Sequence, residues 1–114
     1  MTPDPRPGPF TVRLTEPARA AVALLIRRAR RYVLAARLSA ALMWIEQTLI
    51  DRPLAWGEPR RHYDGLRVTA LHQIHDELHV VYTVHDAEPL VWITQIAPVL
   101  DHPLLQGHWN GNGN

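Results

Sequence analysis

The feature that most constrains the fold of this chain is a change in hydrophobic periodicity near Leu66. From that residue on, apolar and polar residues alternate in three runs, at 66–75, 78–85 and 90–96, joined by short polar segments at 75–77 and 85–89. A period of two residues is typical of a strand with one buried face and one exposed face. The pattern therefore predicts a three-stranded antiparallel meander over residues 66–97.

Residues 18–52 carry a helical pattern and contain no glycine or proline. Their apolar residues form two stripes that differ in phase, and the phase slips near residues 30–34. The first stripe consists of Ala18, Val22, Leu25, Ala29 and Tyr32, and the second of Leu34, Leu38, Leu42, Ile45 and Leu49. We predict two helices packed as a hairpin, with one bent helix as the alternative. A cluster of arginines lies near the predicted junction: Arg27, Arg28, Arg30 and Arg31.

The remaining segments complete the predicted domain. Residues 10–14 alternate apolar with polar residues and predict a short strand, after which Thr15 and Pro17 suit the first turn of a helix. Residues 54–65 contain two glycines and a proline among polar residues, so they predict an irregular loop, pinned by Trp56 and Tyr63. The chain of 114 residues is expected to form one α+β domain over 10–100, between a disordered arm at 1–9 and a flexible tail at 101–114.

Composition excludes several kinds of chemistry. The chain has no cysteine, which rules out disulfides, thiolate zinc sites and a cysteine nucleophile. No apolar run approaches the roughly 20 residues that span a bilayer, so we expect a cytoplasmic protein without a membrane partner. The formal charge of +1 is too small to indicate nucleic-acid binding by itself. The seven histidines lack the helical spacing of metal ligands, so we expect no metal and no cofactor.

Four segments, in order, resemble the RelE/ParE family of bacterial toxins. Residues 10–18 (FTVRLTEPA) are similar to its first strand and "T-P-E-A" helix start, and residues 51–57 (DRPLAWG) to its "P-x-x-G" turn. Residues 63–67 (YDGLR) are similar to its "G-L-R" strand start, and residues 78–84 (LHVVYTV) to its "Y-R-V-x-Y-x-V" strand. The resemblance covers residues 10–98 and implies the same order of strand, helical hairpin and meander. His79 stands where the family usually has arginine or lysine, and its late "H-R-x-x-Y" motif is absent.

The resemblance implies the toxin component of a type II toxin–antitoxin system, with a cognate antitoxin as partner. One branch of the family consists of ribosome-dependent, metal-independent endoribonucleases that cut messenger RNA. A ParE-like inhibitor of DNA gyrase, which needs no catalytic residues, and a noncatalytic protein-binding member are the alternatives. The absent late motif favours these two alternatives, whereas the basic, histidine-rich strands favour the endonuclease.

Candidate site residues follow from the predicted hairpin. A symmetric hairpin would pair Gln73 with His79 and Arg67 with His85, which puts these side chains on one solvent-facing side of the sheet. RNA cleavage by its own 2′-hydroxyl needs a base, an acid and cations, which histidine and arginine supply. The candidate catalytic residues are Arg67, His79 and His85, and the candidate RNA-binding residues are Arg60, Arg61, His62 and His75. An ordinary polar surface is the alternative interpretation of each residue.

Overall fold

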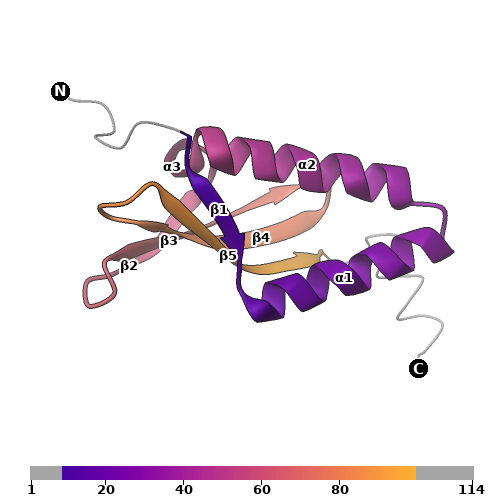
Figure 1. The fold of residues 1–114 in the computed structure, drawn as a ribbon, viewed down its shortest axis with the longest axis horizontal. Coiled ribbons are helices and arrows are strands. Elements are labelled where there is room, and N and C mark those ends of the chain that lie inside the picture. The colour runs from indigo at the N-terminus through magenta and orange to yellow at the C-terminus, as the bar shows by residue number, and fades with distance from the viewer. Residues whose placement is uncertain (1–8, 100–114) are drawn as a thin grey trace.

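The computed structural model describes residues 9–99, which form the predicted α+β domain (Figure 1). The predicted arm, apart from Pro9, and the predicted tail lie outside these residues. In chain order, the elements are β1 (Thr11–Leu14), α1 (Glu16–Arg31), α2 (Ala35–Asp51), α3 (Pro53–Trp56), β2 (Glu58–Tyr63), β3 (Val68–His75), β4 (Leu78–His85) and β5 (Leu90–Pro98). The described helices include none that is long and apolar enough to cross a membrane.

One five-stranded sheet, in the order β1-β5-β4-β3-β2, organises the domain. β1 pairs in parallel with β5, and the other neighbours are antiparallel, so the predicted meander is confirmed as β3, β4 and β5. The prediction of an irregular loop at 54–65 was wrong, because this segment contains α3 and the edge strand β2. All six residues of β2 are exposed, so no hydrophobic alternation marks the strand. Pro59 is tolerated there because β2 lies at an edge of the sheet.

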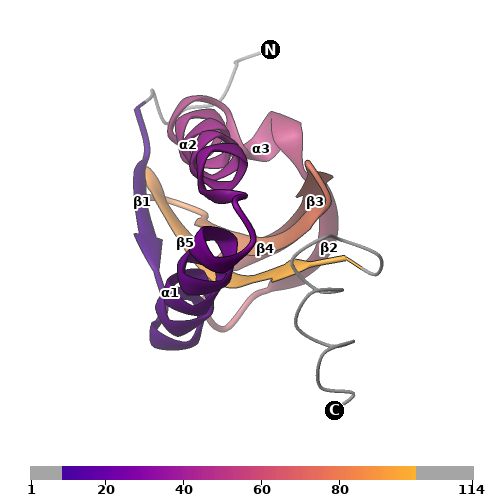
Figure 2. The same ribbon diagram turned by 90° about the vertical axis from the view of Figure 1, so that its right-hand side faces the viewer.

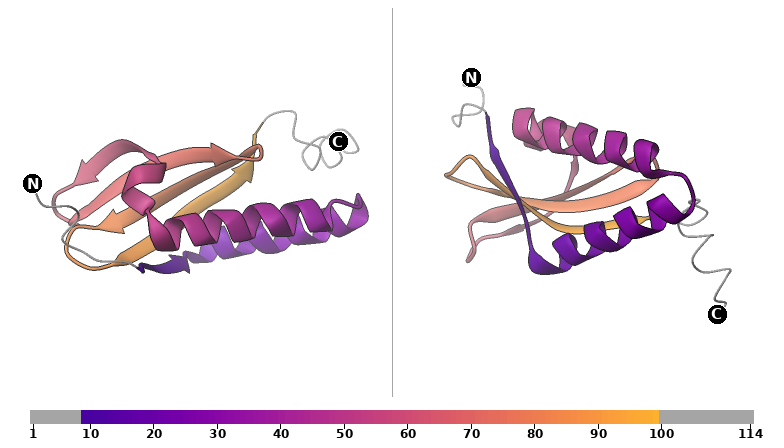
Figure 3. Two further views of the ribbon diagram at one scale, coloured as in Figure 1. Left: turned by 90° about the horizontal axis from the view of Figure 1, so that it is seen from above. Right: turned by 45° about the vertical axis from the view of Figure 1, so that its right-hand side comes forward.

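The helical segment is broken where the phase slips, so the prediction of two helices is confirmed. The Thr15 hydroxyl accepts a hydrogen bond from the Ala18 N–H at 3.4 Å and caps α1. The chain leaves α1 through Val33, which has a φ of 57° and is 91% exposed. Both helices lie on the same side of the sheet (Figures 2 and 3). The other side is therefore left open by the helices, and it is called the open face below.

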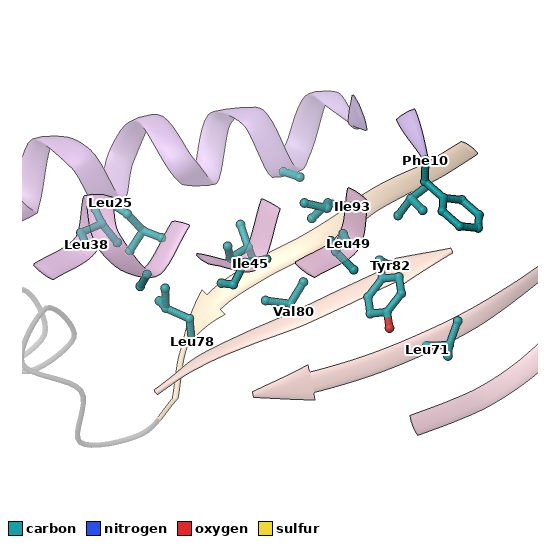
Figure 4. Close-up of a cluster of buried hydrophobic side chains, with 14 of the residues drawn as sticks. Phe10, Leu25, Leu38, Ile45, Leu49, Leu71, Leu78, Val80, Tyr82 and Ile93 are labelled. Carbon is teal, nitrogen blue, oxygen red and sulfur yellow. The ribbon is translucent and has the colours of Figure 1, made fainter. Parts of the chain in front are cut away.

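Tyr82, on β4, lies at the centre of the core between the helices and the sheet (Figure 4). Its ring is fully buried, and its hydroxyl donates to the Pro53 carbonyl oxygen at 2.5 Å. The same hydroxyl accepts a hydrogen bond from the Gly57 N–H. A Cβ at position 57 would overlap the hydroxyl, so glycine allows the backbone to approach this closely. Tyr82 thereby fastens α3 and the start of β2 onto the middle of the sheet.

The β3–β4 turn shows that the predicted register of these two strands was wrong by one residue. Asp76 and Glu77 have φ values of 48° and 64°, so a two-residue turn with left-handed geometry pairs His75 with Leu78. His79 therefore pairs with Ile74, and not with Gln73 as predicted. A turn was predicted at 75–77, but its length was wrong by one residue, because two-residue turns of this kind usually carry Asn-Gly or Asp-Gly. Here the Arg37 guanidinium braces the turn instead, at 2.7 Å from Asp76 and 3.1 Å from Glu77.

A shift of one residue exchanges the two faces of a strand. The predicted face of β3 was therefore wrong. Thr69, Gln73 and His75 pair with or adjoin residues of the buried side of β4, and they lie on the helix side of the sheet. Val68, Ala70 and His72 share the open face with His79, Thr83 and His85. This exchange decides which side chains meet at the candidate site.

Candidate functional site

The open face carries a row of paired residues that crosses the sheet from edge to edge. The row runs through Arg61, Ala70, Thr83, Trp92 and Arg13. Because Ala70 and Thr83 are small, they leave space beside the arginine on β2. A hollow of about 470 Å³ lies there, and it is called the sheet hollow. It is lined by Arg60, Arg61, Tyr63, Ala70, Val81, Thr83 and Thr94.

Backbone irregularities on both sides shape the sheet hollow. The pairing of β2 with β3 shifts between Pro59 and Arg61, so Arg60 occupies a bulge. A second shift lies where β4 pairs with β5, and the Thr94 hydroxyl donates to the Val81 carbonyl oxygen at 3.2 Å. Bulges redirect side chains and are common beside functional sites. Two arginines, a hydroxyl and the Tyr63 ring thus border one space, which suits a phosphate group and an adjoining base.

A pair of histidines adjoins this region on β3 and β4. The Nδ1 atom of His72 lies 3.1 Å from the Nε2 atom of His79, so one nitrogen donates to the other. Burial lowers the pKa of His79 from its ordinary value, and the charges of His72 and Arg60 lower it further. His79 is therefore neutral near pH 7 and can accept a proton. The sequence interpretation did not select His72, since the predicted register placed it on the other face.

The structure separates two of the predicted catalytic residues. His79 and His85 are six residues apart on β4, a distance of roughly 20 Å along a strand. His85 pairs with Val68 at the far end of the open face, close to the turn that carries Arg67. The Asp86 N–H donates to the Arg67 carbonyl oxygen at 2.9 Å, which holds this turn against the β4–β5 turn. His79 and His85 therefore cannot contact the same phosphate.

Carboxylates hold His62, one of the predicted RNA-binding residues. Its Nε2 atom lies 2.9 Å from Asp86, and its Nδ1 atom lies 2.8 Å from Asp64. The hydrogen bond to Asp86, followed by the other attractions of both carboxylates, raises the pKa of His62 above its ordinary value. Protonated His62 thus links the β2–β3 turn to the β4–β5 turn, and its charge is offset locally.

His75, another predicted RNA-binding residue, belongs to the helix side of the sheet. Its ring stacks on Trp44 of α2, with the centroids 3.9 Å apart and the planes 8° from parallel. Arg60 and Arg61 are therefore the predicted RNA-binding residues that border the sheet hollow. Over residues 9–99, no three or more histidine, aspartate or glutamate side chains form a group that could hold a metal ion.

Comparisons with solved structures identify the class of fold. No protein-family model matches the chain, and no curated protein matches it. A chain of the RelBE2 toxin–antitoxin complex from Mycobacterium tuberculosis matches with a TM-score of 0.59 and 23% identity, over 82% of this chain and 95% of that chain. A chain of the archaeal RelE–RelB complex from Pyrococcus horikoshii matches with a TM-score of 0.57 and 11% identity, over 82% and 99%. The domain therefore has the α+β fold found in RelE–RelB complexes, as the sequence resemblance implied.

Proposed function

We propose that this chain is the toxin component of a type II toxin–antitoxin system and acts on messenger RNA in the cytoplasm. One observation carries the proposal: a domain with this fold presents an arginine-lined hollow beside a neutral histidine on its open face. Guanidinium groups bind phosphate through paired hydrogen bonds, and the exposed ring of Tyr63 offers a surface on which a base can stack. Arg60 and Arg61 are assigned to the phosphate.

The proposed reaction is attack by the RNA's own 2′-hydroxyl, on the ribosome and without a metal. His79 accepts the hydroxyl proton, the 2′-oxygen forms a bond to the neighbouring phosphorus, and the bond from phosphorus to the 5′-oxygen breaks. The proton taken up by His79 is shared with His72 across 3.1 Å, and this pair returns a proton to the leaving 5′-oxygen. Arg67 and His85, at the other end of the open face, are assigned to a neighbouring phosphate.

Cleavage by the purified protein on ribosomes programmed with messenger RNA tests these roles. His79→Gln should lower the cleavage rate by about 10²-fold or more, the usual effect of losing a general base. His75→Gln is the matched control, since it removes a histidine from the helix side of the same sheet and should change the rate much less. Equal rates for wild type and His79→Gln would refute the assignment of the base.

The separation of His79 from His85 favours a second candidate function. The two histidines selected from the sequence for catalysis do not meet at one phosphate. If the His72–His79 pair does not transfer protons either, the same surface would act by contact alone, as in a ParE-like inhibitor of DNA gyrase. Induced expression distinguishes the candidates: growth arrest with cut messengers supports the endonuclease, whereas arrest with intact messengers and damaged DNA supports gyrase inhibition. If expression does not arrest growth, the result supports a noncatalytic protein-binding member of the fold.

The groove between α1 and α2 is the proposed contact for the antitoxin. It has a volume of about 340 Å³, and its lining includes Ile26, Leu42 and Met43, of which Met43 is 66% exposed. Arg30 and Glu46 also line the groove, so an amphipathic partner segment would find both apolar and charged contacts. Co-purification with the product of the adjacent reading frame tests this assignment. Met43→Glu should weaken the complex, and Met43→Leu should preserve it.

A further inference from the structure

A second arginine surface lies on α1, on the opposite side of the sheet from the sheet hollow. Arg27, Arg28 and Arg31 are spaced so that they share one side of the helix. With Leu24 and Tyr32 they line a hollow of about 270 Å³. No acidic side chain contributes to this lining. These three arginines are called the α1 arginine stripe.

The stripe faces away from the groove proposed for the antitoxin. Arg30, on the same helix, lines the groove between α1 and α2, whereas the hollow at the stripe has no lining residue from α2. The end of α1 and the start of α2 also project beyond the ends of the strands (Figures 1 and 3). A partner in the groove would therefore leave the stripe accessible.

The charges of the stripe are not offset by the protein around it. Among the described residues, no ion pair joins Arg27, Arg28 or Arg31 to a carboxylate. Arginines three and four positions apart on a helix repel each other. The carboxyl end of the helix attracts basic residues, but this attraction acts on the whole last turn and does not select one side. An anion bound over the hollow would relieve the repulsion.

We infer that the α1 arginine stripe binds the phosphate backbone of structured RNA. Arginine forks suit phosphate, and the hollow between them provides room for it. Arg13, Arg60 and Arg61 lie on the other side of the sheet, so a small domain presents arginines on two opposite surfaces. Such an arrangement matches an extended polyanion better than a single acidic peptide. The inference does not rest on cleavage by the open face.

Binding of a labelled 2′-O-methyl RNA hairpin tests the inference, because this RNA lacks the hydroxyl needed for cleavage. The affinity is measured by fluorescence anisotropy between about 50 mM and 200 mM salt. The variant R27Q/R28Q/R31Q should reduce the slope of log affinity against log salt by about 2 to 3, since each phosphate contact contributes about 0.7–0.9. The matched control R19Q/R30Q/R52Q removes the same charge outside both arginine surfaces and should leave the slope nearly unchanged.

Three outcomes would overturn the inference. The wild-type protein could fail to bind the hairpin, or both triple variants could lose affinity equally, which would indicate the field of the whole molecule. Polyglutamate could compete as well as unlabelled hairpin at equal charge, which would indicate an acidic protein partner. Glutamine preserves helix propensity, so R27Q/R28Q/R31Q should fold. If its circular dichroism shows otherwise, R27Q and R31Q carry the same test singly, each with a slope reduced by about 1.

Discussion

Tyr82→Phe should destabilise the domain strongly although it removes a single oxygen atom. The hydroxyl donates to Pro53 and accepts from Gly57, and the ring is fully buried. Phenylalanine would leave the buried Pro53 carbonyl oxygen without this partner, at a cost of about 1–3 kcal/mol, and the half-buried Gly57 N–H would also lose its acceptor. We expect a loss of about 2–3 kcal/mol, and at roughly 4–8 °C per kcal/mol for a domain of this size Tm should fall by about 10–20 °C.

Urea unfolding monitored by tryptophan fluorescence gives the free energy of unfolding directly. The midpoint should fall while the slope m stays constant, because the amount of surface exposed on unfolding does not change. Tyr63→Phe is the matched control, since Tyr63 is 40% exposed and its hydroxyl is not buried in the core. We expect a change below about 0.5 kcal/mol for this control. Equal stabilities of Tyr82→Phe and the control would refute the proposed role of the hydroxyl.

Three further predictions concern Gly57, His62 and His79. Gly57→Ala should lower Tm, because the new Cβ would lie 2.9 Å from the Tyr82 Cζ atom; an unchanged melting curve would contradict the tight approach. Because the pKa of His62 is raised on folding, this residue contributes stability that is full below its unfolded pKa near 6.5 and is lost as pH rises through its folded pKa. His62→Gln should therefore flatten the alkaline side of the curve of unfolding free energy against pH. The lowered pKa of His79 makes stability depend on pH in the opposite direction. Its contribution is full above its unfolded pKa and is lost as pH falls through its folded pKa, so His79→Gln should flatten the acid side. Urea midpoints from about pH 5 to pH 9 measure both effects, and parallel pH profiles for wild type and variants would contradict them.

The parts of the fold that were predicted correctly are those with a strong hydrophobic period. The two apolar stripes and the alternation in β4 and β5 reflect burial of one face, so they can be recognised in the sequence. The alternation in β3 indicated a strand but not which of its faces is buried. β2 was missed because its six exposed residues have no buried face, and its place depends on pairing with β3. The position of α3 depends on Tyr82, which comes 29 residues after Pro53. No pattern within a short stretch of the sequence predicts a contact between residues so far apart.

The candidate site was only partly predictable, because its composition depends on the β3–β4 turn. The left-handed conformations of Asp76 and Glu77 shift the register by one residue, and this shift brings His72, in place of His75, onto the face of His79. Arg37 of α2 braces the turn at a distance of 39 residues in sequence from Asp76, so the helical hairpin helps to determine which histidines meet on the other side of the sheet. The proposed chemistry thus depends on a contact between elements, because the predicted register would have placed His75, and not His72, on the face of His79.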